Sequence, residues 1–133
     1  MRIFLDSNIV IYLIEQPANW GERASVRIEA ILEAGDRMVV SDLVRMECRV
    51  RPLATNDEQS LADFDDFFAS EKVQVVPITA SICDRAAAIR ANYRFRPLDA
   101  LHLAAATEKG CQRFLTHDLR LQIFPDIIVD VLS

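Results

Sequence analysis

Short apolar runs alternate along the chain with segments in which apolar residues recur at the spacing of a helix. The short runs are typical of strands that are buried on both faces, as in a parallel sheet. Strands are predicted at residues 3–5, 37–40, 72–78, 113–116 and 127–131. Helices are predicted between them, at residues 9–13, 21–34, 43–50, 57–68, 79–94 and 97–110.

Proline and glycine residues mark several of the predicted helix ends. Pro17 and Pro52 are expected to stop the helices that precede them, because proline interrupts the helical hydrogen-bond ladder. Gly35 and Gly110 are expected to end two others, whereas Pro97 suits a first helical position. The alternation predicts an α/β fold, with a parallel five-stranded sheet between helical layers and right-handed crossovers.

Length and composition indicate a single domain. The chain has 133 residues, enough for one hydrophobic core and too few for two, so residues 1–133 are expected to form one domain. No apolar run approaches the roughly 20 residues of a membrane-spanning helix, and the first residues lack a signal-peptide pattern. Cys48, Cys83 and Cys111 are far apart and lack metal-site spacing. We therefore expect a reduced, cytoplasmic setting with the thiols as core fillers.

Four acidic residues are placed where the predicted fold would bring them to one edge of the sheet. Asp6 and Asp118 follow the first and fourth strands, and parallel strands share the edge at their carboxyl ends. Glu47 lies one to two turns into the helix after the second strand, and Asp99 lies in the first turn of another helix. If the fourth strand lies beside the first, these carboxylates meet. Neutral oxygen donors stand near them in the sequence: Ser7, Asn8 and Thr116.

Each acid also has a simpler interpretation. Asp6 can cap the following helix, and Asp99 is favoured near a helix N-terminus by the helix dipole. Asp118 can begin a turn, and Glu47 can lie on a solvated helix face, although Met46 beside it makes full exposure less natural. The four together are harder to explain in this way, because the sheet brings independent elements to one place.

Convergence of four carboxylates has an energetic cost that indicates a bound cation. Two carboxylates about 5 Å apart repel by roughly 3 kcal/mol at an effective dielectric constant of ~20. Several such pairs would rival the whole stability of a small domain, about 5–15 kcal/mol. Oxygen ligands without clustered histidine or cysteine favour Mg²⁺, or Mn²⁺, over zinc. A site with one or two such ions suits the attack of water on a phosphodiester bond.

The charge balance argues against a general binder of polyanions. The formal net charge is −5 and the pI is about 5.0. A nuclease, however, needs only local positive potential, and carboxylates that hold a cation still count as full negative charges in this sum. The negative net charge is therefore compatible with a metal-dependent nuclease.

Four motifs, in this order, resemble the PIN-domain family and within it the VapC-type toxin ribonucleases of type II toxin–antitoxin systems. They are Leu5-Asp6-Ser7-Asn8, Met46-Glu47, Leu98-Asp99-Ala100-Leu101-His102-Leu103-Ala104 and Leu115-Thr116-His117-Asp118. The resemblance covers nearly the whole chain. It implies a single PIN domain, a Mg²⁺-dependent ribonuclease that acts on RNA, and a homodimer that a cognate antitoxin holds inactive.

The resemblance also implies roles for the acids. Asp6, Asp99 and Asp118 are expected to bind the metal, and Glu47 to bind it or to orient the attacking water. Attack on phosphorus would leave a 5′-phosphate and a 3′-hydroxyl. Supporting roles are implied for Ser7, Asn8 and Thr116.

Other charged residues near these motifs have less specific interpretations. His117 is expected at the surface rather than as a general base, and His102 is expected to face the helix packing. Arg45, Arg49 and Arg51 either contact RNA phosphates or form a solvated helix face.

The residues leave two alternatives to an active ribonuclease. A catalytically silent PIN-like module would bind RNA or a protein without cutting, although such a module would not need four mutually repelling acids. Another acid-bearing α/β domain fits less well. A haloacid-dehalogenase phosphatase needs a second acid where this chain has Asn8, and a phosphoacceptor receiver domain needs paired acids at the first strand.

Overall fold

The computed structural model describes all residues from 1 to 133 as five strands, six α-helices and one 3₁₀ helix. The strands are β1 (Arg2–Leu5), β2 (Arg37–Ser41), β3 (Val73–Val76), β4 (Arg113–Thr116) and β5 (Ile128–Val131). The helices are α1 (Ser7–Glu15), α2 (Trp20–Glu33), α3 (Asp42–Ala54), α4 (Glu58–Ala69), α5 (Ala80–Tyr93), α6 (Pro97–Glu108) and the 3₁₀ helix η1 (Leu119–Ile123). None of them combines the length and the apolar character that a membrane crossing requires.

All five strands are parallel and form one sheet in the order β3-β2-β1-β4-β5, which confirms the predicted fold class. β4 lies directly beside β1, with Leu5 opposite Leu115. The chain moves outward from β1 through β2 to β3, and then crosses back to β4 and β5 on the other side. The reversal falls between β1 and β4, and in open α/β sheets this is where ligands bind, at the carboxyl ends of the strands.

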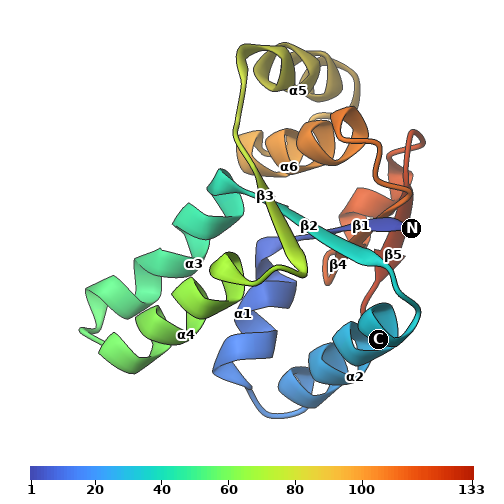
Figure 1. The fold of residues 1–133 in the computed structure, drawn as a ribbon. Helices are drawn as coiled ribbons and strands as arrows, with labels where there is room; N and C mark the ends of the chain where they lie inside the picture. Colours follow the sequence, from blue (N-terminus) through green and yellow to red (C-terminus); the bar gives the residue numbers. More distant parts are fainter.

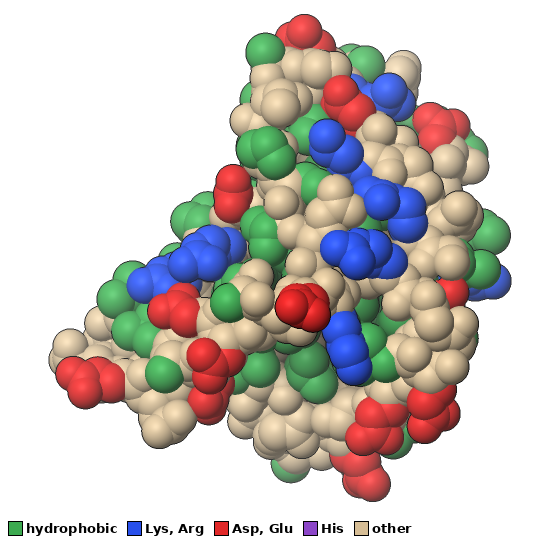
Figure 2. Space-filling model, viewed as in Figure 1, with side chains coloured by type: hydrophobic (Ala, Val, Ile, Leu, Met, Phe, Trp, Pro, Cys, Tyr) green, Lys and Arg blue, Asp and Glu red, His purple; other side chains and the backbone are tan.

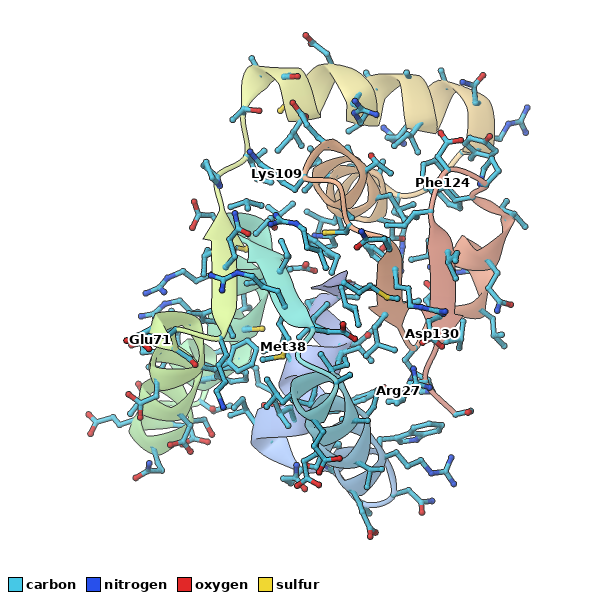
Figure 3. All side chains as sticks on the ribbon, turned by 45° about the vertical axis from the view of Figure 1, so that its right-hand side comes forward. Arg27, Met38, Glu71, Lys109, Phe124 and Asp130 are labelled. Carbon is cyan, nitrogen blue, oxygen red and sulfur yellow. The ribbon has the colours of Figure 1, made fainter.

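Helices cover both faces of the sheet (Figure 1). α5 and α6 pack together on one face, α1 and α2 lie on the other, and the α3–α4 pair extends from one side of the sheet. In the centre, the rings of Phe4 on β1 and Phe114 on β4 stack with centroids 5.3 Å apart. At the sheet margin, Arg27 on α2 pairs with Asp130 on β5 at 2.5 Å (Figure 3).

Three helix starts follow local capping chemistry. Ser41, Asp57 and Thr79 each precede a helix, and the side-chain oxygen of each accepts a hydrogen bond from the backbone N–H three residues later. These distances are 3.3, 3.0 and 3.2 Å, respectively. Each cap satisfies a helix N–H that would otherwise have no partner. The hydrogen bonds that the backbone N–H and hydroxyl of Ser60 donate to Asp57 also hold the pKa of this carboxyl below its usual value.

Three details differ from the expectations. α3 continues through Pro52 to Ala54, because a proline this close to the end withholds only the N–H that would reach the carbonyl of Cys48. β3 ends before Pro77 rather than at Ile78, since proline cannot donate to the sheet ladder. The short η1 helix had no periodic signal in the sequence.

The cysteines also divide differently from the expectation. Cys48 and Cys111 are buried, and burial raises the pKa of the two thiols to about 12 and about 11. Cys83 is exposed on α5, so the prediction that all three fill the core was wrong for this residue.

Candidate active site

Asp6 stands at the end of β1 and also caps α1. Its Oδ1 accepts a hydrogen bond from the backbone N–H of Ser7 at 2.8 Å, and its Oδ2 accepts one from the hydroxyl of Thr116 at 2.8 Å. The residue is only 4% exposed. Burial raises the pKa of Asp6, while the charge of His102 and the hydrogen bond from Thr116 act in the opposite direction. The capping interpretation is therefore correct, but the two contacts also fix this carboxylate in a dry position.

Glu47 on α3 meets His102 on α6. The Nε2 atom of His102 lies 2.5 Å from Oε1 of Glu47 and 3.9 Å from Oδ1 of Asp6. We call Asp6 and Glu47 the inner pair. His102 is 1% exposed, and its Nδ1 has no hydrogen-bond partner, so its polar contacts depend on Nε2. Burial alone lowers the pKa of His102, but the hydrogen bond to Glu47 and the charge of Asp6 outweigh it, and the pKa lies above its usual value.

His102 thus has more than the packing role expected for it. It is buried among helices as predicted, but its ring also links two carboxylates from β1 and α3. Its positive charge, where present, offsets their repulsion.

Asp99 and Asp118 form the outer pair, and two arginines contact both. Arg96 Nε donates to Asp99 Oδ2 at 3.1 Å, and its Nη2 lies 3.7 Å from Asp118 Oδ2. Arg120 Nε donates to Asp118 Oδ1 at 3.0 Å, and its Nη2 lies 3.6 Å from Asp99 Oδ2. A second, closer contact joins Arg120 Nη2 to Asp118 Oδ2. The hydrogen bonds from Arg120 hold the pKa of Asp118 below its usual value.

The loop after β4 is held to the start of α1 by the predicted supporting residues. The backbone N–H of Asp118 donates to the Thr116 hydroxyl at 3.0 Å, and that hydroxyl donates to Asp6. The Asn8 side chain accepts from the backbone N–H of His117 at 3.2 Å and donates to Asp6 at 3.5 Å. Thr116 and Asn8 therefore connect the two strand ends.

His117 is not the free surface residue that the sequence suggests. Its ring is half-buried, with Nδ1 2.7 Å from the Tyr12 hydroxyl and the ring centroid 4.0 Å from that of Trp20. The guanidinium of Arg23 lies over the ring of Trp20, 4.7 Å from its centroid. His117 makes no hydrogen bond to any of the four acids.

The four acids lie in one region but as two pairs, each facing the protein's own cations. The Thr116 hydroxyl links the two pairs, because it donates to Asp6 at 2.8 Å and accepts from the backbone N–H of Asp118 at 3.0 Å. No group of three or more His, Cys, Asp or Glu side chains comes together closely enough to hold a metal ion as the side chains stand. The sequence predicted the region, but not the division into pairs.

The donor chemistry nevertheless fits a hard divalent ion. The candidate donors are the oxygens of four carboxylates, with the Thr116 hydroxyl beside Asp6, and no thiol contacts them. Arginine already faces the two outer carboxylates, and the two inner ones face His102, which offsets their repulsion when it is protonated. An ion would have to replace arginine at the outer pair, and Mg²⁺ or Mn²⁺ is the class of ion that such oxygens bind.

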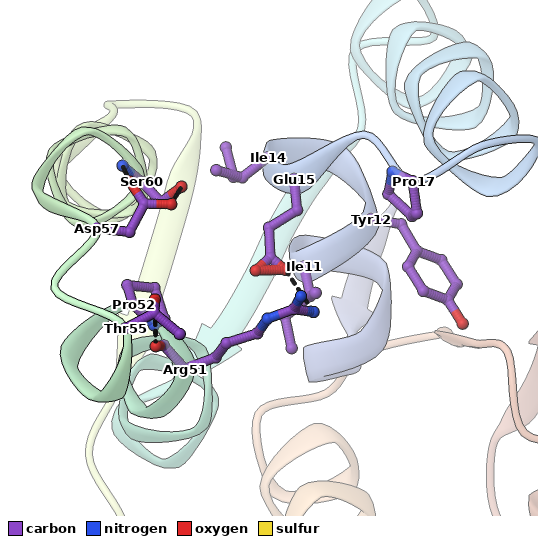
Figure 4. A pocket seen from close by; sticks show the side chains of 10 residues that line it. All are labelled: Ile11, Tyr12, Ile14, Glu15, Pro17, Arg51, Pro52, Thr55, Asp57 and Ser60. Atoms are coloured by element: carbon purple, nitrogen blue, oxygen red, sulfur yellow. Dashed lines mark hydrogen bonds and ion pairs between the residues drawn. The ribbon is translucent and has the colours of Figure 1, made fainter.

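The largest cavity lies away from these acids and is lined by α1, α3 and the start of α4, with a volume of about 620 Å³ (Figure 4). Arg51 reaches across it to Glu15, with Nη1 3.9 Å from Oε2. Arg45 and Arg49 both pair with Asp65 on α4. These contacts support the helix-face interpretation of the three arginines.

Sequence reasoning missed two residues of the site, Arg96 and Arg120. It also missed the role of His102 in linking two carboxylates. A local signal existed for the arginines: one precedes Asp99 by three residues, and the other follows Asp118 by two. Each of these arginines folds back onto its own acid. No comparable local signal marks His102, since its partner Glu47 is 55 residues away.

The PIN domain family model matches residues 3–126, which is most of the chain. A comparison with curated protein sequences finds no match.

Several solved structures share the fold. VapBC2 from Rickettsia felis, bound to a promoter DNA fragment, superposes with a TM-score of 0.82 at 16% identity, over 100% of both chains. DNA-bound VapBC from Salmonella typhimurium gives 0.79 at 20% identity, over 100% of this chain and 99% of the other. VapC20 from Mycobacterium tuberculosis, described as a sarcin-ricin loop cleaving toxin, gives 0.69 at 17% identity, over 84% and 86%. At these identities the likeness establishes the fold.

Proposed function

Because the chain belongs to the PIN domain family, we propose that it is a Mg²⁺-dependent endoribonuclease and the toxin of a VapBC-type toxin–antitoxin pair. The observation that carries the proposal is that four acidic side chains lie as two pairs around the strand reversal, with the Thr116 hydroxyl joining Asp6 to the backbone of Asp118. They come from the end of β1, from α3, from the start of α6 and from the end of β4: Asp6, Glu47, Asp99 and Asp118.

In the proposed reaction, Asp6, Asp99 and Asp118 would hold the ion, and Glu47 would hold it or orient the attacking water. When bound, Mg²⁺ or Mn²⁺ would favour deprotonation of a water molecule and stabilise charge on the leaving oxygen. Attack on phosphorus would give a 5′-phosphate and a 3′-hydroxyl.

The chain's own contacts prepare these groups. Thr116 and the backbone of Ser7 fix both oxygens of Asp6, so this carboxylate is oriented before any ligand arrives. The short contact between His102 Nε2 and Glu47 Oε1 places a proton between these two atoms. Glu47 remains 24% exposed, so its second oxygen can face water and substrate.

The proposed partners are an antitoxin and a second copy of the chain. Two of the similar structures are described as VapBC complexes, which supports an antitoxin. An apolar strip on α3 also supports a protein partner, because Met46, Val50 and Leu53 are 45%, 58% and 56% exposed. We propose a cytoplasmic protein in which residues 1–133 form one PIN domain.

The negative total charge does not prevent contact with RNA. Basic side chains gather over the middle of one face, while most acidic ones lie around its margins (Figure 2). Local positive potential of this kind can attract phosphates although the formal net charge is −5.

A catalytically silent module is the second candidate, and the ion pairs of the outer acids favour it. Arg96 and Arg120 satisfy Asp99 and Asp118 without any ion. In this alternative the chain binds RNA or a protein, and the acids have a structural role.

Cleavage of single-stranded RNA by the purified protein, with Mg²⁺ or with a chelator, separates the two candidates. We expect cleavage with Mg²⁺, loss of cleavage with chelator, and a loss of at least about 100-fold in Asp6→Asn. Asp126→Asn is the matched control, because Asp126 is an exposed acid outside the site. Sequencing the RNA ends checks the products.

Equal cleavage by wild type and Asp6→Asn would remove Asp6 from the mechanism. An inactive wild type whose melting temperature does not respond to Mn²⁺ would support the silent module. Circular dichroism of both variants shows whether the fold is retained.

A further inference from the structure

The two arginines of the outer pair stand between the acids and solvent. The side chains of Arg96 and Arg120 are 67% and 60% exposed, whereas those of Asp99 and Asp118 are 13% and 20% exposed. We propose that these arginines form a clasp, which holds the outer acids when no ion is bound and turns to the phosphates of single-stranded RNA when an ion takes its place. This inference rests on the proposed function.

The contacts of the clasp are crossed, so neither arginine belongs to one acid alone. Oδ2 of Asp99 lies 3.1 Å from Arg96 Nε and 3.6 Å from Arg120 Nη2. Oδ2 of Asp118 lies 3.7 Å from Arg96 Nη2 and still closer to Arg120 Nη2. One oxygen of each acid therefore faces two guanidinium groups, where a divalent ion would supply comparable charge. The clasp and the ion compete for the same atoms.

The arginines can leave without disturbing the core. Both side chains are exposed, one at the start of α6 and one in η1, and exposed ion pairs contribute little to stability. His102 at the inner pair differs, since it is 1% exposed and enclosed by the fold. A divalent ion can therefore replace the protein's own cation at the outer pair, but not at the inner pair.

Once released, the guanidinium groups would lie beside the place where a phosphodiester must be held. Arginine presents a planar fork of donors that matches phosphate oxygens and keeps its charge at all relevant pH values. The two guanidinium groups would stay in solvent after release, because both side chains already face solvent. The ion and RNA should therefore strengthen each other's binding, as reciprocal coupling demands.

The test compares two double variants that lose the same charge. Arg96→Gln/Arg120→Gln removes the clasp, and Arg85→Gln/Arg94→Gln removes two exposed arginines that make no ion pair with the site acids. Mn²⁺ binding is measured by calorimetry without RNA. The clasp variant should bind Mn²⁺ about fivefold more tightly than the control variant, because no internal cation competes.

RNA binding is measured by fluorescence anisotropy with a phosphorothioate single-stranded RNA, which resists cleavage and keeps its backbone charge. With saturating Mn²⁺, the clasp variant should bind about tenfold more weakly than wild type. The slope of log affinity against log salt should become shallower by about 1.4, the value for two lost phosphate contacts to a single strand. Adding Mn²⁺ should steepen this slope in wild type and in the control, but not in the clasp variant.

The outcomes separate the clasp from the function on which it rests. If wild type binds Mn²⁺ and cuts RNA but the two double variants behave alike, the clasp is wrong and the ribonuclease stands. If the clasp variant binds Mn²⁺ no more tightly, or if Mn²⁺ leaves the wild-type salt slope unchanged, the clasp is also wrong. If wild type neither binds Mn²⁺ nor cuts RNA, the proposed function fails and the clasp with it.

Discussion

The inner and outer acidic pairs use the same chemical groups but are held in opposite ways. Asp6 and Glu47 share one buried histidine, and Asp6 is further fixed by Thr116 across the sheet. Asp99 and Asp118 share two arginines that extend into solvent. The inner pair therefore depends on a histidine buried in the core, and the outer pair on two exposed arginines, although Glu47 itself is 24% exposed.

Because of this difference, one part of the site stabilises the fold and the other part can change its partners. A desolvated carboxylate with fixed partners cannot reorient freely, so it offers a ligand in a constant place. A carboxylate whose partners are exposed can exchange them at little cost to the fold. We expect the inner pair to carry stability and the outer pair to carry the response to ligands.

The largest expected effect concerns removal of the inner cation. His102→Leu leaves Glu47 without its hydrogen-bond partner and Asp6 without a nearby positive charge, and should lower the free energy of unfolding by about 3 kcal/mol. Urea unfolding followed by circular dichroism measures this change.

Arg96→Leu is the matched change at the outer pair. It should lower the free energy of unfolding by less than about 1 kcal/mol, because its ion pairs are exposed. Equal losses in the two variants would contradict the distinction between the pairs.

The next effect is stabilisation by metal, which should depend on the outer pair. At a Mn²⁺ concentration of about 100 times the dissociation constant, one bound ion adds about 2.7 kcal/mol to the free energy of unfolding. Asp99→Asn should lose most of this increment and keep the metal-free stability of wild type. Thermal unfolding with Mn²⁺ and with chelator measures both quantities.

A metal response that survives Asp99→Asn unchanged would exclude this acid from the ion site. An additional loss of metal-free stability above about 1 kcal/mol would place Asp99 with the inner pair instead.

The smallest effect is the pH dependence of the inner pair in metal-free protein. The pKa of His102 lies above its unfolded value of 6.5: burial lowers it, but contact with Glu47 and the charges of Asp6 and Asp99 prevail. A raised pKa adds stability that is fully present below pH 6.5 and is lost as the pH rises through the folded value. The loss is small because neutral histidine can still donate from Nε2.

The free energy of unfolding should therefore fall with rising pH above 6.5 in wild type, and fall less in His102→Gln. Urea titrations at a series of pH values give both curves. Parallel curves for the two proteins would show that His102 is not charged in the folded state.

The sequence by itself determined the strands and α-helices, their order and the region of the acids. Strand and helix types follow from apolar spacing, and caps such as Ser41 and Asp57 act on backbone groups three residues away. The alternation implied a parallel sheet, and such a sheet brings Asp6 and Asp118 to one edge whatever the remaining side chains are. Information of this kind is local or follows from topology.

Only the tertiary structure decided which cation faces which acid. The contact of Glu47 with His102 depends on how α3 and α6 are rotated and packed, and no pattern within either helix contains that angle. The crossing of Arg96 from Asp99 to Asp118 likewise requires the start of α6 to lie beside the end of β4. Side-chain partners between distant elements are set by packing, whereas periodicity records only the face that each element buries.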